Sequence, residues 1–190
     1  KDTKYGNNNV VGPEPKEAKH GTHVAGIVAQ VRGNNKGGDG VTNNAQILTV
    51  RAVPNGDEYD KDIALGIRYA VDNGAKVING SFGKYFSQNK EWVIDAIKYA
   101  ESKDVLVVIA AGNESYDTTP LNTYEYLQGT SMASPNVAGV ATLIRSYYPS
   151  LTAVQVKQII MESGTPLKNT VTIGEDKHKA NFADASKSGK

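Results

Sequence analysis

Residues 129–135, Gly-Thr-Ser-Met-Ala-Ser-Pro, carry the most information about the fold and chemistry of this chain. A run of small residues follows Ser131 and predicts the start of a helix that reaches Tyr148, with Pro135 in the first turns, where proline is tolerated. Negative charge is favoured at a helix N-terminus, because the backbone N–H groups point outward there. Ser131 is therefore suited to be a nucleophile whose attack creates an oxyanion. The alternative is that Ser131 is only the N-cap of the helix, a common role of serine.

Strand and helix patterns alternate along the rest of the chain. Apolar runs predict strands over residues 47–53, 76–82 and 105–111. Helical spacing predicts helices over 21–31, 60–73, 89–103 and 131–148, and a capping box at Thr152 opens another to about residue 162. Loops are expected over 1–19 and 33–44, and an irregular polar segment after Gly164. This order predicts an α/β fold of three layers, with a mostly parallel sheet between helices.

The carboxyl ends of two predicted strands carry candidate site residues. Ligands bind outside the carboxyl ends of the strands in such sheets. Asn113 follows one strand and can donate its amide to an oxyanion, although an asparagine after a glycine is also typical of a turn. An extended peptide could pair with the strand end formed by Ser81, Phe82 and Gly83. The small side chains of Ala110, Ala111 and Gly112 leave room for a pocket at the other strand end. Both segments could also be ordinary strand ends.

Two histidines precede the first predicted strand, within His-Gly-Thr-His-Val-Ala-Gly at 20–26. His20 lies at the mouth of the predicted helix and is the candidate general base, because an imidazole takes up and returns a proton near neutral pH. His23 is expected to be a structural side chain, hydrogen-bonded near the site. A zinc pair is the alternative, but the His-Glu-x-x-His spacing that favours zinc is absent.

Composition excludes several classes of function. The chain has 190 residues, enough for one domain, with 21 basic and 20 acidic side chains and a net charge of +1. This balance indicates no general attraction to nucleic acid or to an anionic membrane. The absence of cysteine excludes a thiol nucleophile, disulfides and cysteine-bound zinc. A nucleotide-binding loop is disfavoured, because no helix pattern follows Gly37-Gly38-Asp39-Gly40.

At this point the chain resembles the subtilisin-like serine proteases, the subtilases. Four motifs carry the resemblance and occur in the family's order: residues 20–26, Asn-Gly-Ser-Phe-Gly at 79–83, Ala-Ala-Gly-Asn-Glu at 110–114, and residues 129–135. The resemblance implies a serine endopeptidase with His20 as base, Ser131 as nucleophile and Asn113 as oxyanion donor. It also makes residues 81–83 and 110–112 the substrate cleft. The α/β-hydrolase elbow, Gly-x-Ser-x-Gly, is absent because position 133 is alanine.

Three departures from the family pattern lead to a hypothesis of incompleteness. No apolar strand ending in Asp-Ser/Thr-Gly precedes His20, where the family carries its catalytic aspartate; Asp2 lies in a polar segment. Asn113 and Ser131 are only 18 positions apart, and the chain stops at Lys190, where relatives continue. We expect residues 1–190 to be a single, partial subtilisin-like peptidase domain, with the aspartate-bearing segment and an internal segment near 115–120 absent. The rival is a shortened natural protein, a catalytically impaired peptide-binding domain that keeps the fold.

The resemblance also implies partners and a location. The chemistry requires no cofactor, and structural calcium is a habit of the family. The loop with Asn34, Asn35 and Asp39 offers only one carboxylate, fewer than a calcium site usually has, so no calcium site is assigned. The expected partners are a polypeptide substrate and a propeptide or protein inhibitor, with neither nucleic acid nor membrane. The expected location is extracellular, periplasmic or at the cell surface.

Overall fold

The computed structural model describes residues 6–54, 56–84, 86–112, 129–166, 170–173 and 178–181. Its elements follow the predicted alternation of helices and strands. In chain order they are η1 (Pro15–Glu17), α1 (Lys19–Ala29), α2 (Asp60–Asp72), β1 (Val77–Gly80), α3 (Lys90–Ser102), β2 (Leu106–Ile109), α4 (Thr130–Tyr147), α5 (Ala153–Ser163), β3 (Thr170–Ile173) and β4 (His178–Asn181).

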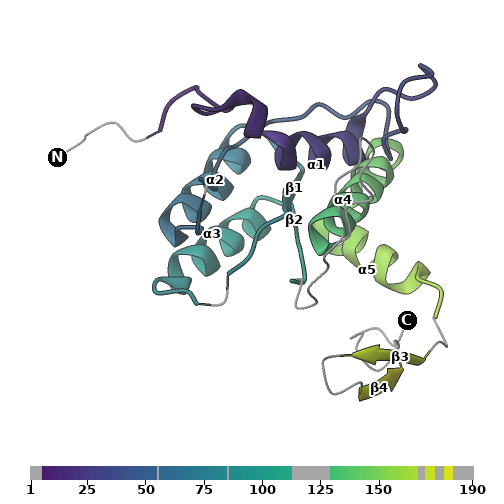
Figure 1. Cartoon of the computed structure of the whole chain (residues 1–190). Coiled ribbons are helices and arrows are strands. Elements are labelled where there is room, and N and C mark those ends of the chain that lie inside the picture. Colours follow the sequence, from purple (N-terminus) through teal and green to yellow (C-terminus); the bar gives the residue numbers. More distant parts are fainter. Residues whose placement is uncertain are drawn as a thin grey trace.

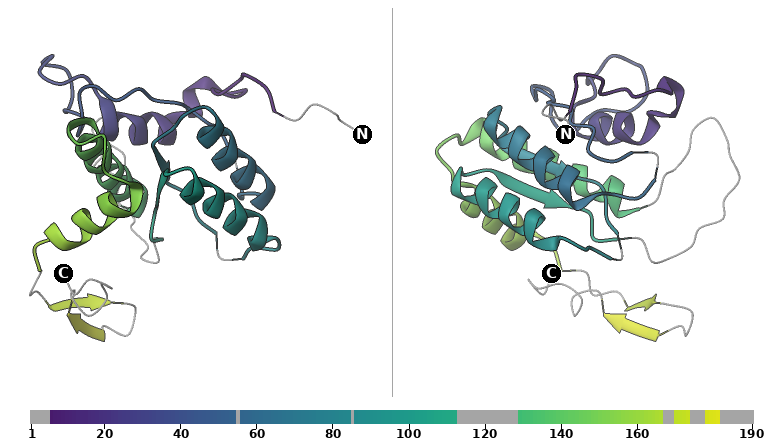
Figure 2. Two further views of the ribbon diagram at one scale, coloured as in Figure 1. Left: turned by 180° about the vertical axis from the view of Figure 1, so that it is seen from behind. Right: turned by 90° about the vertical axis from the view of Figure 1, so that its left-hand side faces the viewer.

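The predicted three-layer α/β architecture is confirmed. β1 and β2 pair in parallel, with Val77 opposite Leu106 and Gly80 opposite Ile109. Helices α2 and α3 lie on one side of these strands, and α4 and α5 lie on the other (Figure 1). The two further views show the same order of layers (Figure 2). Helix α1 crosses one end of the layers and packs against α4.

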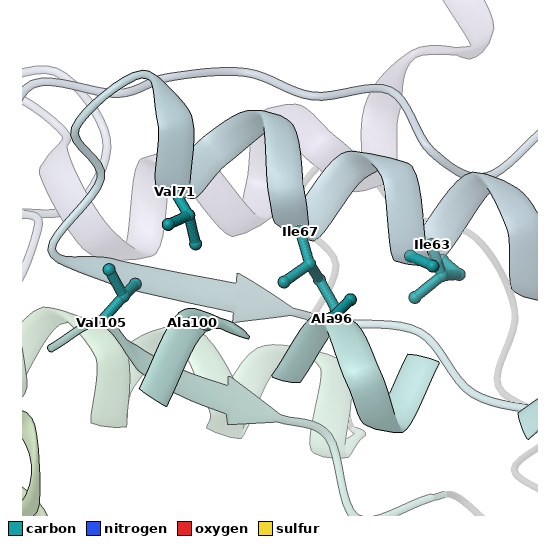
Figure 3. Packing of buried hydrophobic residues seen from close by; sticks show 7 residues of the cluster. Ile63, Ile67, Val71, Ala96, Ala100 and Val105 are labelled. Carbon is teal, nitrogen blue, oxygen red and sulfur yellow. The ribbon is translucent and has the colours of Figure 1, made fainter. Parts of the chain in front are cut away.

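The core lies between α2, α3 and the strands. Ile63, Ile67 and Val71 follow one another at intervals of four residues, so they form one buried face of α2 (Figure 3). Ala96 and Ala100 of α3 have no exposed surface, and their small side chains let the two helices approach closely. This packing fixes the position of β1, whose carboxyl end carries candidate site residues.

The strand predicted over residues 47–53 is wrong. These residues form no regular element, and Ile47 and Leu48 are 47% and 44% exposed. Their composition suits a strand, but a strand also needs a hydrogen-bonded neighbour, and no described strand pairs with them. The lack of a pairing strand therefore outweighed the local preference for extended backbone.

The irregular segment predicted after Gly164 is wrong as well. β3 and β4 form an antiparallel hairpin, with Thr170 opposite Asn181 and Ile173 opposite His178. The sequence Thr-Val-Thr-Ile is rich in β-branched residues, which favour extended backbone even in a polar segment. This hairpin forms a sheet of its own, apart from β1 and β2.

Several large apolar side chains on or next to α1, α3 and α4 are exposed. Val31 is 66% exposed because α1 ends at Ala29. On α4, Val137 and Val140 are each 40% exposed, whereas Ala138 and Ala141 are buried. The smallest side chains face inward because α4 packs closely: a Cβ added to Gly139 would lie 2.7 Å from the Cβ of Val41. Trp92 of α3 is also exposed.

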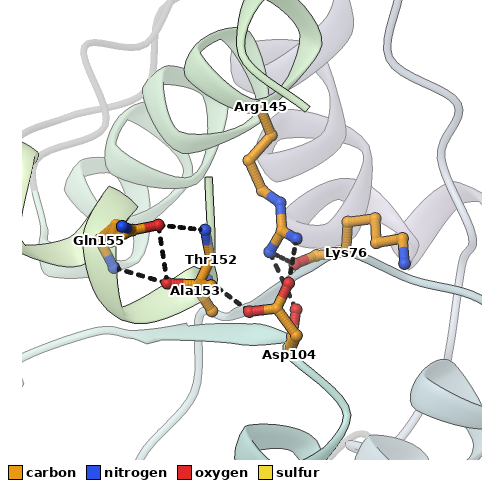
Figure 4. A network of polar contacts seen from close by, with 6 residues as sticks. All are labelled: Lys76, Asp104, Arg145, Thr152, Ala153 and Gln155. Carbon is orange, nitrogen blue, oxygen red and sulfur yellow. Dashed lines mark hydrogen bonds and ion pairs between the residues drawn. The ribbon is translucent and has the colours of Figure 1, made fainter. Parts of the chain in front are cut away.

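Asp104 joins three elements at the amino end of β2 (Figure 4). Its Oδ1 accepts a hydrogen bond of 2.6 Å from the backbone N–H of Ala153, and its Oδ2 pairs with the Arg145 guanidinium. The backbone N–H of Ala153 and the charge of Arg145 hold the pKa of Asp104 below its usual range. The predicted capping box is confirmed, because Thr152 and Gln155 exchange hydrogen bonds at the start of α5. We call the contacts of Asp104 with Arg145 and Ala153 the Asp104 clamp.

Candidate active site

Ser131 lies in the first turn of α4 but is not its N-cap. The N-cap position is occupied by Gly129, which provides no side-chain cap, and the helix begins at Thr130. The alternative role of Ser131 as a helix cap is therefore wrong. Its side chain is half-buried, at the helix end where negative charge is favoured.

Ser81 supplies a hydrogen bond that Pro135 cannot. In a regular α-helix the carbonyl of Ser131 accepts from the N–H of residue 135, but proline has no N–H. The Ser81 hydroxyl donates to that carbonyl at 2.7 Å. Pro135 thus lies in the second turn of α4, beyond the first positions where proline has no cost, and Ser81, the residue after β1, provides the missing donor.

A chain of side-chain hydrogen bonds extends this contact. The Asn79 amide donates to the Ser81 hydroxyl at 2.9 Å, and the Ser134 hydroxyl donates to the Asn79 carbonyl oxygen at 2.7 Å. The Ser131 hydroxyl makes only a long contact, 3.5 Å to the Ser81 carbonyl. The first turns of α4 are therefore fixed against β1, while the Ser131 hydroxyl itself is weakly held.

Sequence analysis did not single out Asn79 and Ser134 as functional residues. Both belong to motifs that it quoted, residues 79–83 and 129–135. The available signal was Asn79, a polar side chain inside an apolar strand, because a buried polar group needs a hydrogen-bond partner. Ser134 is 5% exposed and has that partner in Asn79.

The end of β2 is tied to the same helix start. The N–H of Gly112 donates to the Thr130 hydroxyl at 2.9 Å, and that hydroxyl donates to the Gly112 carbonyl at 3.0 Å. Ala111 and Gly112 are exposed, and Ala110 is half-buried beside Gly80, to whose carbonyl its N–H donates. The structure thus places residues 110–112 next to residues 129–131. Asn113 lies outside the described residues.

The predicted base lies on a neighbouring helix. His20 is in the first turn of α1, which begins at Lys19, and its side chain is exposed. α1 packs against α4, the helix of Ser131. Within the described part of the chain, no hydrogen bond joins His20 to Ser131. His23 is exposed too, so the expectation of a hydrogen-bonded structural side chain is wrong for it; α1 turns that face to solvent.

The predicted substrate strand leaves β1 with its backbone partly engaged. Phe82 is half-buried and packs against the core, whereas Gly83 is exposed. The N–H of Gly83 donates to the Glu58 carboxylate at 3.2 Å. Lys84 donates to the backbone carbonyl of Glu58 at 3.0 Å. Glu58, in the segment before α2, therefore lies against residues 83 and 84.

Asp60, at the start of α2, anchors the chain that follows this strand. Its carboxylate is 6% exposed and pairs with Lys84 at 2.6 Å. It also accepts from the Ser87 hydroxyl and the Asn89 N–H, each at 2.8 Å. The Lys84 bond, followed by the Asn89 and Ser87 bonds, lowers the pKa of Asp60 from 3.8 to about 2.

The described residues do not fit a metal site. No group of three histidine, aspartate or glutamate side chains in this part of the chain could hold an ion. In the loop considered for calcium, Asp39 accepts from the N–H of Gly33 and Asn34 accepts from the N–H of Lys36. These oxygens stabilise the turns of their own loop, so we assign no calcium there.

The described parts of the four motif segments now have a place in the structure. Comparisons with known proteins extend over most of the chain. A sequence profile of the subtilase family matches residues 1–122 and 115–185. The chain belongs to the subtilase family. This subtilase is 34% identical over 198 residues to the thermophilic serine proteinase of Bacillus sp. (strain AK1), and the aligned region covers 80% of this chain and 48% of that protein. It is 36% identical over 172 residues to thermitase of Thermoactinomyces vulgaris, covering 67% and 61%.

A solved structure shows the same fold. The subtilase superposes on a protease of Pseudoalteromonas arctica PAMC 21717 with a TM-score of 0.66 and 29% identity, covering 77% of this chain and 64% of that one. The chain thus spans about half to three fifths of the length of the first two relatives. None of the described helices has the length and apolar character needed to cross a membrane.

Proposed function

We propose that this subtilase is a serine endopeptidase whose nucleophile is Ser131. The observation that carries the proposal is the position of Ser131: it lies at the N-terminus of α4, where hydrogen bonds hold the carboxyl ends of β1 and β2. Membership of the family supports the same reading. A hydroxyl with only a 3.5 Å contact is free to turn toward a substrate carbonyl.

The proposed reaction uses two further residues. His20 takes the proton of Ser131 as its oxygen attacks the peptide carbonyl, and then returns it to the leaving amine. The backbone N–H of Ser131 and the amide of Asn113 donate to the oxyanion. Water, activated by His20, then hydrolyses the acyl-enzyme. The roles of His20 and Asn113 rest on the family resemblance, and the exposure of His20 agrees with a ring that must reach substrate.

We further propose that residues 1–190 form one domain with a short connection between Asn113 and Ser131. In support, the family profile matches in two stretches that overlap at residues 115–122, so the match restarts within this connection. The aspartate that would orient His20 is not assigned. Asp2 lies outside the described residues.

The remaining parts of the proposal rest on the resemblance alone. The substrate is a polypeptide that pairs with residues 81–83, and a propeptide or protein inhibitor would occupy the same cleft. The chemistry needs no cofactor, and calcium, if bound, would be structural. The location is outside the cytoplasm.

Labelling with a fluorophosphonate, followed by mass mapping of the modified peptide, tests the proposal. Modification of Ser131 is expected, with loss of labelling in Ser131→Ala and no change in Ser150→Ala, whose serine is exposed in the turn after α4. An unlabelled protein that still unfolds cooperatively would contradict the proposal and favour the peptide-binding alternative.

A further inference from the structure

The Glu58 carboxylate occupies a backbone donor that a bound peptide would need. Strand addition to residues 81–83 requires their free N–H and C=O groups. The exposed N–H of Gly83 instead donates to Glu58 at 3.2 Å. A peptide that pairs with Gly83 must replace this carboxylate with one of its own carbonyl oxygens.

The charge of Glu58 is not neutralised by its neighbours. Lys84 forms its ion pair with Asp60 at 2.6 Å, and its hydrogen bond to Glu58 goes to the backbone carbonyl. Among the ion pairs of the described residues, none includes Glu58. The side chain is half-buried, so its field is less screened than that of a fully exposed carboxylate.

Glu58 also has a fixed place beside the strand. Its backbone is held by Lys84, and the next turn of chain enters α2 at Asp60, which binds Ser87 and Asn89. Once displaced from Gly83, the carboxylate therefore stays beside the bound peptide.

We infer that Glu58 makes the cleft selective for peptides with a lysine or arginine at the residue that pairs with Gly83. This inference rests on the proposed function, because it takes residues 81–83 as the substrate strand. A basic side chain gives the displaced carboxylate a partner, whereas an acidic one adds repulsion. A neutral peptide must compete with Glu58 for the Gly83 N–H without that compensation.

The test measures binding rather than hydrolysis. Fluorescein-labelled tetra-alanine peptides carry one lysine, glutamine or glutamate at each position in turn, and fluorescence anisotropy gives Kd for the Ser131→Ala protein. At one position we expect lysine to bind about fivefold to tenfold more tightly than glutamate. Adding Glu58→Gln should abolish this preference. Adding Glu101→Gln, which removes the same charge from the exposed end of α3, should preserve it.

The outcomes separate this inference from the proposed function. A lysine preference that survives Glu58→Gln, or no preference at any position, overturns the role of Glu58, even if fluorophosphonate labels Ser131. A preference that depends on Glu58 in a protein whose Ser131 is not labelled supports the role of Glu58 and removes only the catalytic proposal. Absence of peptide binding overturns the inference, because residues 81–83 then form no cleft.

Discussion

The surroundings of Ser131 and those of His20 differ in how they are held. Ser131 lies at a helix start that is hydrogen-bonded to the chain beyond both strands, through Ser81 after β1 and Gly112 after β2. His20 is exposed on α1 and has no hydrogen bond to Ser131 within the described residues. Contacts between described segments therefore position Ser131, the proposed nucleophile.

The two sides differ in the contacts that they require. The Ser131 side needs only β1, β2 and α4, and α4 packs directly against both strands. The His20 side needs a partner that orients the imidazole, since a free ring samples many orientations. The two sides should therefore respond differently to mutation.

Replacing the base gives the largest expected effect. If His20 activates Ser131, His20→Ala should slow fluorophosphonate labelling by about 10²–10⁴-fold, the usual contribution of a general base. His23→Ala, three residues along on the same exposed helix, should leave the rate unchanged. Equal effects of the two variants, measured as second-order labelling rates, would exclude His20 as the base.

The hydrogen bond that compensates for Pro135 can be tested by a double-mutant cycle. Ser81→Ala leaves the Ser131 carbonyl without its donor and should lower the free energy of unfolding by about 1–2 kcal/mol. In a Pro135→Ala background the helix regains its own N–H, so the cost of Ser81→Ala should fall by about 1 kcal/mol. Urea denaturation measures all four proteins. Strictly additive costs would show that Ser81 does not compensate for the proline.

The sequence predicted the Ser131 side well because its signals are local. The helix start at residues 129–135 and the two strands could be predicted from periodicity and small residues. The link from Ser81 to the Ser131 carbonyl could not, because it joins residues 50 positions apart. That link is decided by how strands pack against helices.

Other errors have the same origin. Residues 47–53 have the composition of a strand but lack a described partner, and residues 170–173 look polar but pair with 178–181. Apolar spacing alone would also place Val31, Val137 and Val140 on inward faces, but helix ends and close packing decide which residues are covered, and these three are exposed. Composition therefore predicted where elements could form, and pairing decided which did.

The Asp104 clamp provides a contrast at the opposite end of β2. Asp104→Asn keeps a residue that tolerates the observed φ of 57° but removes the charge that pairs with Arg145. Because the Asp104 side chain is 46% exposed, we expect a loss of only about 1 kcal/mol in unfolding free energy. Labelling of Ser131 should not change. A slower labelling rate in the folded variant would show that the two ends of the sheet are coupled.

The smallest expected effect is on the pH dependence of stability, through Asp60 and the residues that follow the proposed substrate strand. The pKa of Asp60 falls from 3.8 to about 2 on folding, so its stabilisation is complete above pH 3.8 and is lost as pH falls toward 2. Asp60→Asn should flatten this part of the stability curve, measured by thermal unfolding between pH 5 and 2 in steps of about half a unit. Asp95→Asn, an exposed carboxylate of α3, is the matched control. An unchanged acid limb in Asp60→Asn would contradict the assigned role of Lys84, Ser87 and Asn89.

The double hydrogen bond between Gly112 and Thr130 has a consequence for how such chains can diverge. It brings together the two ends of the segment from 113 to 128, so that segment leaves and re-enters the domain at one point. In general, doubling the length of a chain segment whose ends are joined costs only about 0.6 kcal/mol in closure entropy. Sequence can therefore be gained or deleted at this junction without moving β2 or α4, which makes it a natural splice site for grafting new loops.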